Sequence, residues 1–328
     1  MIGEQIKSNL SISSHLPQIV KFPGTCGEFI QGQLLDGQDF LISNIIDRFS
    51  IISVQYNYDS KIIKIVPKEH SVKIFKMAKL VLKYLNSEEI GLIIHRKSEL
   101  QIGKGQASSS AELAGTAKSL GSLLGYQFSN SELDRLLTHI EPTNPVYYSK
   151  PVIYNHKWGI VYEFLDFLPP LNLIVFVGEK SVNTCDFNNK KRFYDKSERL
   201  TSFKALNLFC KGVLAQNLNF ISKASTLSAE LNQSFNFNDK LDLVKKIALK
   251  QGAYGINVSH SGMCIGCLFP QDSSKNMSNL ISEIRDYYPD NDVYFAKSLL
   301  NRFYLNEEMI EWKSSKILQK QLEEPLLL

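Results

Sequence analysis

The residues best suited to chemistry lie in one short stretch about a third of the way along the chain. Residues 100–112 read Leu-Gln-Ile-Gly-Lys-Gly-Gln-Ala-Ser-Ser-Ser-Ala-Glu, so two glycines precede three consecutive serines. Glycines let the backbone turn tightly and approach a ligand closely. Serines in the first turn of a helix lie beside unpaired N–H groups and the positive end of the helix dipole. The spacing therefore predicts an anion site whose hydroxyls bind phosphate oxygens or a hard cation such as Mg²⁺.

This stretch has a second interpretation. It is not a Walker A loop, because its glycines and lysine lack the GxxxxGK[ST] spacing. A serine cap on a tightly packed helix of small residues fits the same pattern, and the stretch alone does not decide between the two. Lys104 lies inside the loop, where its ammonium would neutralise phosphate charge, and a solvated lysine fits this position nearly as well.

The stretch needs a strand and a helix to position it. Residues 91–95 are apolar and predict a strand, whereas residues 107–124 are rich in small residues and predict a helix. Residues 72–85 have helical periodicity before it, and residues 129–132 form a capping box that predicts a further helix after it. We therefore expect the serines at a strand-to-helix junction.

The rest of the chain mixes strands and helices. We predict strands at 18–22, 29–33, 40–46, 50–56, 62–66, 159–164, 171–177, 256–259, 263–269 and 293–296, and helical stretches at 192–231, 240–251 and 273–287. The order is α+β and lacks strict βαβ alternation. Leu168-Pro169-Pro170 suggests a boundary, which gives an N-terminal domain at 1–167 and a C-terminal domain at 168–328.

The overall composition narrows the class of partner. The chain has 328 residues, of which 44% are hydrophobic and 21% charged, with a formal net charge of +4, as in an ordinary globular protein. Its lysines and arginines are spread along the chain, which argues against nucleic-acid binding. The opening residues lack signal-peptide features, and no apolar run approaches the ~20 residues that span a bilayer. We expect a cytoplasmic protein with a small-molecule ligand and no membrane partner.

The five cysteines are few and scattered, which favours a reducing compartment. Cys264 and Cys267 match a CxxC pattern, but no second pair follows at zinc-ribbon spacing. The apolar run around them predicts a strand, so we interpret both as buried thiols and not as a metal or redox site.

Together with two further segments, the serine loop resembles the three motifs of the GHMP kinases, a family that includes galactokinase, homoserine kinase and mevalonate kinase. The second motif of that family runs P-x-G-x-G-L-G-S-S-A-A, and residues 103–111 follow it with Gln-Ala in place of Leu-Gly. Residues 22–32 look like the first motif, near the substrate site. Residues 252–262 look like the third, a glycine loop that closes over the site. The three segments occur in the family's order.

This resemblance implies a fold and a phosphoryl donor. The fold would be the two-domain α+β GHMP kinase fold, with an N-terminal half like ribosomal protein S5 and a ferredoxin-like C-terminal half. ATP would be the donor, Mg²⁺ its cation, and a small molecule with a hydroxyl group the acceptor. The residues implied to hold ATP are Gly103, Gly105, Gln106, Ala107, Ser108, Ser109 and Ser110. Ser109 would ligate Mg²⁺ by motif position, with Glu141 as the acidic ligand and Glu132 or Glu112 as alternatives.

Within the family, the amino-acid sequences of the motifs are similar to those of the L-threonine kinases. Outside the serine loop, the matching residues are Cys26, Gly27, Glu28, Gln31, Gly32, His260, Ser261 and Gly262. The resemblance implies phosphorylation of the side-chain hydroxyl of a free amino acid such as L-threonine. Another amino acid, a small alcohol, or a non-catalytic relative that only binds a nucleotide or metabolite stays open, as does a homodimer.

Two positions depart from the subgroup pattern. Asn144 and Asn183 each stand where the subgroup has an Asp. In several GHMP kinases the Asp at the position of Asn144 acts as the base. The Asp at the position of Asn183 would meet a substrate ammonium. An amide cannot accept a proton as a carboxylate does, but phosphoryl transfer depends mainly on positioning and charge stabilisation. We therefore expect Asn144, Lys104 and Glu28 in the reaction. The expected substrate-binding residues are Glu28, Asn144, Asn183, Thr184, His260, Ser261 and Gly262.

Overall fold

The computed structural model describes residues 16–180 and 194–299. The elements, in chain order, are β1 Gln18–Gln33, β2 Asp39–Tyr56, β3 Ile63–Val66, α1 Val72–Tyr84, β4 Leu92–Ser98, α2 Ser108–Leu123, α3 Asn130–Ile140, β5 Val152–Asn155, β6 Ile160–Phe164, β7 Leu171–Val177, α5 Lys196–Leu214, α6 Leu218–Asn232, α7 Leu241–Lys250, β8 Gly255–Val258, β9 Cys264–Pro270, α8 Ser274–Tyr287 and β10 Asp292–Lys297.

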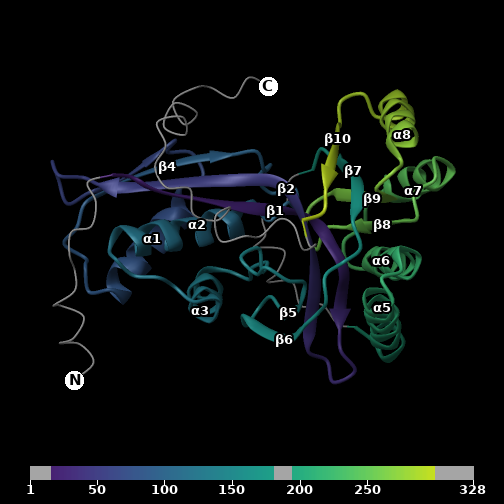
Figure 1. The fold of residues 1–328 in the computed structure, drawn as a ribbon, viewed down its shortest axis with the longest axis horizontal. Coiled ribbons are helices and arrows are strands. Elements are labelled where there is room, and N and C mark those ends of the chain that lie inside the picture. The colour runs from purple at the N-terminus through teal and green to yellow at the C-terminus, as the bar shows by residue number, and fades with distance from the viewer. Residues whose placement is uncertain (1–15, 181–193, 300–328) are drawn as a thin grey trace.

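One sheet connects both halves of the described chain. Its strand order is β10-β7-β9-β8-β1-β2-β4-β3, and β5 joins β2 and β6 beside this path. The long strands β1 and β2 run through most of the molecule (Figure 1). The sequence predicts two strands here, at 18–22 and 29–33, because the Gly24–Gly27 segment between them has turn residues. In the structure β1 runs through this segment without a break. The chain absorbs the turn residues as shifts in register against β2, at Pro23/Gly24 and again between Thr25 and Glu28, so the strand continues.

The helices form two groups. Helices α1, α2 and α3 cover the sheet in the N-terminal half, and α5 to α8 lie at the opposite end of the molecule (Figure 1). Helix α2 packs on both β1 and β2, whereas α6 packs on β1 and β8. The larger hydrophobic core lies under the first group and extends to α5 and α6, and a smaller one joins β7, β8 and β9 to α7 and α8. The start of α2 is thereby anchored to the two long strands.

Most predicted elements are present. The predicted helices at 72–85 and 107–124 are α1 and α2, and the capping box at Ser129 opens α3. The single stretch predicted at 192–231 is wrong in one respect, since its described part forms two helices. Gln216 adopts a left-handed conformation with φ 49°, and the side chain of Asn217 caps α6. Cys264 and Cys267 are buried in β9, as predicted.

The predicted boundary between residues 167 and 168 falls between β6 and β7. Strands from both sides of it share the sheet, because Glu28 on β1 pairs with Val258 on β8. The division into 1–167 and 168–328 stays a prediction.

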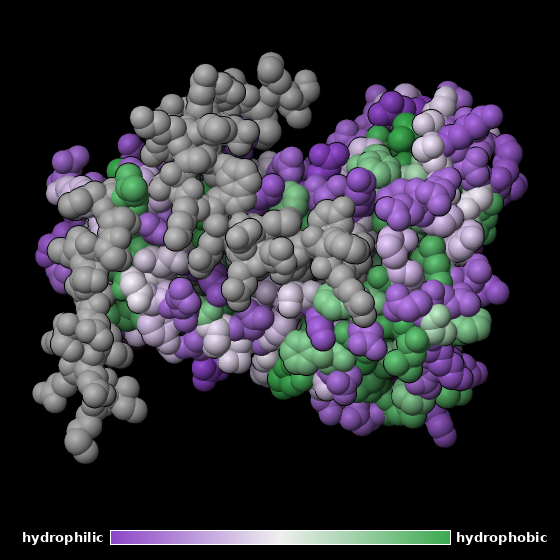
Figure 2. Space-filling view, viewed as in Figure 1, coloured by the Kyte–Doolittle hydropathy of each residue, from purple (hydrophilic) through white to green (hydrophobic). Residues whose placement is uncertain are grey.

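The surface in Figure 2 is mostly polar, with hydrophobic residues gathered over the region that Figure 1 labels β6 and α5. Exposed large hydrophobic residues on these two elements are Ile160, Phe164, Leu200 and Leu214. The homodimer stays a prediction. Among the helices of the described residues, none is long and apolar enough to cross a membrane.

Candidate active site

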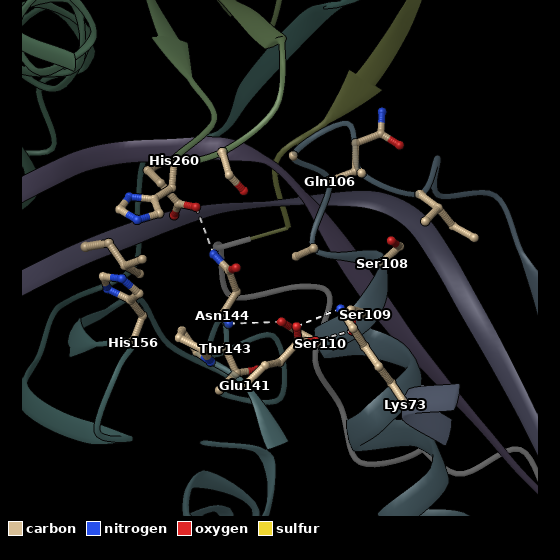
Figure 3. Close-up of a pocket in the computed structure, with 18 residues that line it drawn as sticks. Lys73, Gln106, Ser108, Ser109, Ser110, Glu141, Thr143, Asn144, His156 and His260 are labelled. Carbon is tan, nitrogen blue, oxygen red and sulfur yellow. Dashed lines mark hydrogen bonds and ion pairs between the residues drawn. The ribbon is translucent and has the colours of Figure 1, made fainter. Parts of the chain in front are cut away.

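The three motif segments meet around one cavity of about 300 Å³ (Figure 3). Its lining residues are Glu28, Leu41, Lys73, Ile102, Gly103, Gly105, Gln106, Ala107, Ser108, Ser109, Ser110, Glu141, Pro142, Thr143, Asn144, His156, His260 and Ser261. They come from β1, β2, α1, the loop before α2 and its first turn, the segment after α3, the β5–β6 turn and the β8–β9 loop. We call the end at the serines the phosphate end and the end at Glu28 and the two histidines the acceptor end, after the roles that the sequence analysis predicts for the serines and for Glu28.

The loop before α2 has the geometry of an anion site. Gly103, Gly105 and Ala107 adopt left-handed conformations with φ of 73°, 84° and 54°. Ala107 is the N-cap of α2, and its side chain makes no capping hydrogen bond to the first N–H groups of this helix. Ser108, Ser109 and Ser110 form its first turn. The strained alanine and the uncapped N–H groups leave the helix end to a ligand.

Two glycines let the second and third motif segments touch. A side-chain carbon on Gly105 would lie 2.2 Å from Cβ of Ser259 and 2.3 Å from the carbonyl oxygen of Ser261. A side-chain carbon on Gly262 would lie 2.5 Å from the carbonyl carbon of Lys104. Both glycines also have a positive φ, so any larger residue would push the two loops apart.

A short chain of polar contacts occupies the phosphate end. Ser109 Oγ donates a hydrogen bond to Glu141 Oε1, and Lys73 Nζ lies 2.7 Å from Glu141 Oε2. The alternative acids lie elsewhere: Glu112 pairs with Arg96 at 3.2 Å, and Glu132 accepts hydrogen bonds in the α3 capping box. Burial raises the pKa of Glu112 although Arg96 opposes this. Of the three candidates, Glu141 is the one beside Ser109.

This donor set suits Mg²⁺. Among the described residues, no group of three or more His, Cys, Asp or Glu side chains could hold a metal ion by itself. Mg²⁺ prefers oxygen ligands, keeps several waters, and often binds through one or two protein oxygens together with substrate phosphates. Ser109 and Glu141 supply two such oxygens, and the Lys73 ammonium already places a cation against the Glu141 carboxylate.

At the acceptor end, Glu28 and Asn144 form a connected pair. Asn144 Nδ2 donates to Glu28 Oε1 at 2.8 Å and to Ser43 Oγ at 2.9 Å. The backbone N of Asn144 donates to Ser110 Oγ at 3.0 Å, which links this pair to the phosphate end. Glu28 Oε2 is buried and has no hydrogen-bond partner among the described residues. Burial raises the pKa of Glu28 to about 7, although the hydrogen bonds from Ser43 and Asn144 oppose the rise.

Two histidines from distant segments also line the acceptor end. The rings of His156 and His260 lie edge to face with their centroids 4.6 Å apart. His260 Nδ1 lies 2.8 Å from Gln31 Oε1 on β1. The backbone N of Thr143 donates to the carbonyl oxygen of His156 at 2.9 Å. The acceptor end is therefore built from four separate segments.

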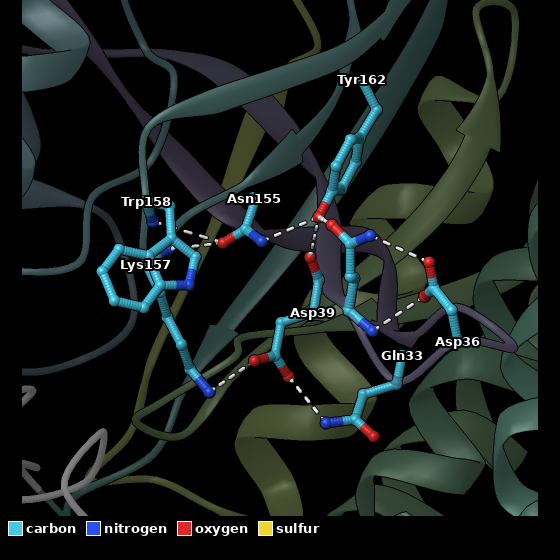
Figure 4. Close-up of polar contacts among 8 residues, drawn as sticks. Gln33, Asp36, Asp39, Asn155, Lys157, Trp158 and Tyr162 are labelled. Carbon is cyan, nitrogen blue, oxygen red and sulfur yellow. Dashed lines mark hydrogen bonds and ion pairs between the residues drawn. The ribbon is translucent and has the colours of Figure 1, made fainter.

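A polar network holds the β5–β6 turn that carries His156 (Figure 4). Lys157 Nζ donates to Asp39 Oδ2 at 2.6 Å, and Asn155 Nδ2 donates to the Tyr162 hydroxyl at 2.8 Å. Asn155 Oδ1 also accepts from the backbone N of Lys157 and of Trp158. These contacts tie the turn to the start of β2 and so fix the position of His156.

Some residues predicted for the site lie outside the cavity lining. Lys104 Nζ points away and donates to the carbonyl oxygens of Gly178, at 3.0 Å, and Glu179. Gly262 packs on the serine loop without lining the cavity. Asn183 and Thr184 lie outside the described residues.

Gln106 lines the cavity, but its side chain mainly holds the loop. Its Oε1 accepts from the backbone N of Gln101 at 2.7 Å, and its Nε2 donates to the Tyr294 hydroxyl at 2.7 Å. Its carbonyl oxygen accepts from the backbone N of Thr25 at 3.0 Å. Gln106 thus fastens the serine loop to β1 and β10.

Sequence reasoning missed Lys73, Thr143 and His156. Lys73 is one of several lysines on α1, so its residue type alone does not distinguish it. Thr143 lies two residues after Glu141, and this closeness in sequence to a predicted site residue was the signal that could have identified it. His156 lies in a turn outside the three motifs, and only the pairing of β5 with β2 and β6 brings it to the cavity.

Comparisons with known proteins show kinases among the relatives of this chain. The family model "GHMP kinases C terminal" matches residues 209–290. An L-threonine kinase of Salmonella typhimurium is 28% identical over 255 residues, covering 76% of this chain and 82% of that protein. An L-threonine kinase of Citrobacter freundii is 26% identical over 261 residues, covering 77% of this chain and 87% of that protein. A putative 4-diphosphocytidyl-2-C-methyl-D-erythritol kinase of Staphylococcus aureus is 26% identical over 260 residues, with 77% and 83% covered.

Solved structures show the same fold. A mevalonate kinase of Methanococcus jannaschii superposes with a TM-score of 0.70 at 18% identity, covering 87% of this chain and 99% of that one. A homoserine kinase of Cytophaga hutchinsonii has a TM-score of 0.68 at 18% identity, with 88% and 98% covered. The chain is thus similar to the GHMP kinases in the sequence of its C-terminal part and in its fold. The predicted two-domain α+β fold class of this family is confirmed.

Its similarity to the GHMP kinases and its relatives named as L-threonine kinases indicate a small-molecule phosphotransferase. Members of this family use ATP and transfer its phosphoryl group to a hydroxyl group of a small molecule.

Proposed function

We propose that this GHMP kinase uses ATP and Mg²⁺ to phosphorylate the side-chain hydroxyl of a free amino acid, with L-threonine as the first candidate. One observation carries the proposal: Asn144 joins a buried, half-satisfied carboxylate to the serine turn inside one cavity. Its side chain binds Glu28, and its backbone N binds Ser110. An acceptor hydroxyl at Glu28 would therefore face phosphates held over the first turn of α2.

The phosphate end would hold the nucleotide. Phosphate oxygens would bind the N–H groups at the start of α2 and the hydroxyls of Ser108 and Ser110, which line the cavity. Ser109 Oγ and the Glu141 carboxylate would hold Mg²⁺, which neutralises charge on the phosphate oxygens when it is bound. These contacts favour charge that develops on the leaving ADP.

Glu28 would accept the proton at the acceptor end. The acceptor oxygen forms a bond to the γ-phosphorus while the bond from that phosphorus to the β,γ-bridging oxygen breaks and ADP leaves. The acceptor proton passes to Glu28 Oε2, the carboxylate oxygen that lacks a hydrogen-bond partner among the described residues. Asn144 Nδ2 donates to Oε1, which leaves Oε2 as the oxygen that would take the proton. Glu28 would thus supply the carboxylate that Asn144 does not.

Support for the amino-acid acceptor comes from the relatives and from the cavity. Two relatives, at 28% and 26% identity, are L-threonine kinases. His156, His260 and Glu28 give the acceptor end groups that can meet both a carboxylate and an ammonium. A free hydroxylated amino acid carries both of these charges and a hydroxyl.

The proposal is tested by measuring ADP release with Mg-ATP across a panel of hydroxylated amino acids and small alcohols. L-threonine should give the highest turnover, and Ser109→Ala should lower it about 100-fold because a hydroxyl at the phosphates is lost. Ser122→Ala, at the far end of the same helix, serves as the matched control and should be neutral.

Turnover with another alcohol alone would keep the kinase and replace threonine. Nucleotide binding without turnover on any member of the panel would sink the catalytic proposal and favour a binding protein.

A further inference from the structure

The phosphate end needs more positive charge than its serines provide. ATP carries several negative charges, and two carboxylates, Glu28 and Glu141, already line the cavity. Among the described residues of the lining, Lys73 is the only lysine or arginine. Two other cationic side chains are engaged elsewhere, since Lys104 binds the carbonyl oxygens of Gly178 and Glu179 and Arg96 pairs with Glu112.

Lys73 is placed to move. It lies in the first turn of α1, and its side chain is 35% exposed, whereas the Glu141 side chain that it contacts is 2% exposed. Figure 3 shows its side chain directed at Glu141, beside Ser109 and Ser110. The Lys73 ammonium thus lies within a side chain's length of the α2 first turn, where the phosphates would be bound.

We propose that Lys73 is a phosphate-contacting residue of this kinase: its ammonium leaves Glu141 when Mg-ATP binds and contacts phosphate oxygens beyond the α-phosphate. The inference rests on the proposed function. Glu141 accepts the ammonium only while no stronger cation competes for its oxygens. Once a divalent ion binds Glu141, the released ammonium meets the phosphates that came with the ion. The ion pair between Lys73 and Glu141 is then replaced by two, one between Glu141 and the divalent ion and one between Lys73 and phosphate.

This exchange predicts effects of opposite sign on metal and nucleotide. Removing the Lys73 charge takes away a competitor for the Glu141 carboxylate, so a divalent ion alone should bind at least as well as before. The same change removes a contact with the polyphosphate, so ATP should bind less tightly. A lysine that only braces Glu141 would, on removal, disorder the carboxylate and weaken metal and nucleotide together.

The test compares Lys73→Met, Lys73→Arg and Lys76→Met in the full chain. Lys76 is one turn further along α1 and exposed, so its methionine variant is the matched control. Calorimetry gives the dissociation constants of ATP, ADP and AMP with Mg²⁺ present, and paramagnetic resonance gives that of Mn²⁺ without nucleotide.

We expect Lys73→Met to weaken ATP and ADP binding by about 10- to 100-fold, the size of a lost charge-assisted contact. AMP binding should stay unchanged, because AMP has no phosphate beyond the α position, and Mn²⁺ binding should stay equal or tighten. Lys73→Arg keeps the charge and should recover most of the ATP affinity. Lys76→Met should match the unsubstituted protein in all four measurements.

ATP affinity in Lys73→Met equal to that of Lys76→Met would overturn the inference, as would an equal loss for AMP. In both cases the proposed function would survive, provided that ADP release is retained. Absence of ATP binding in the unsubstituted protein would instead remove the proposed function, and the inference with it.

Discussion

The two ends of the cavity are built in different ways. The phosphate end comes mainly from one continuous segment, in which Gly103 to Ser110 form a left-handed loop and the first turn of α2. The acceptor end collects Glu28 from β1, Asn144 from the segment after α3, His156 from the β5–β6 turn and His260 from the β8–β9 loop. One end is local in sequence and the other is assembled by the fold.

This difference indicates which end of the cavity tolerates amino-acid substitutions. A local loop takes much of its conformation from its own glycines and helix start, so it depends on fewer other segments. An assembled site depends on every segment that contributes to it. The carboxylate that accepts the proton can therefore move from one segment to another, as proposed here for Glu28 in place of an aspartate at position 144.

The largest expected effect is a loss of kcat without a loss of Mg-ATP binding, which would distinguish the acceptor end from the phosphate end. Glu28→Gln removes the proposed proton acceptor and keeps its shape and its hydrogen bond from Asn144. We expect kcat with the best acceptor to fall about 100-fold or more, since general bases contribute that much. The dissociation constant of Mg-ATP should stay unchanged, because Glu28 lies at the other end. Single-turnover kinetics and calorimetry measure the two quantities.

Glu88→Gln makes the same chemical change at an exposed position and serves as the control. A weaker Mg-ATP complex in Glu28→Gln with kcat intact would place Glu28 at the nucleotide instead and break the comparison.

A smaller effect is expected when the aspartate is restored. Asn144→Asp would put a second carboxylate next to Glu28, where the amide nitrogen now lies 2.8 Å from Glu28 Oε1. Two like charges at that distance raise the pKa of the pair. The rising limb of kcat/KM against pH, expected near 7 from the pKa of Glu28, should move up by about one pH unit or more.

A rising limb that stays in place or moves to lower pH would show that the introduced carboxylate had taken over as the base in the Asn144→Asp variant. The position of Glu28 as the acceptor of the proton would then have to be reconsidered.

The smallest effect concerns stability. The pKa of Glu28 is about 7 in the folded protein against an ordinary value of 4.5, so the folded state holds this proton more tightly. The stability that the protonated carboxyl contributes is complete below 4.5 and is lost as pH rises through 7. Relative to Glu28→Gln, the unsubstituted protein should therefore lose stability between about pH 5 and about pH 8, by roughly 3 kcal/mol at most.

Urea unfolding of the two proteins at both pH values measures this difference. A difference in unfolding free energy that is independent of pH would contradict the raised pKa, and with it the physical basis for Glu28 as a base near neutral pH.

Much of the secondary structure could be predicted from the sequence. The helix at 107–124 and the capping box at Ser129 follow from local patterns, and the structure shows α2 and α3 there. Strand lengths could not be predicted in the same way. The turn residues at Gly24–Gly27 indicated a break, but pairing with β2 and contact with β8 carry β1 through it. Such pairing is a long-range effect that local propensity does not contain.

The sequence by itself determined the serine loop, the order of the three motifs and hence the phosphate end, because a helix start and its glycines act over a few residues. Only the tertiary structure decided which side chains meet there. It turned Lys104 away to the carbonyl oxygens after β7 and brought Lys73 to Glu141 instead. It also brought Asn144 to Glu28, 116 residues away along the chain. The physical reason is that these partners are selected by packing in three dimensions, where separation along the chain carries no information about distance.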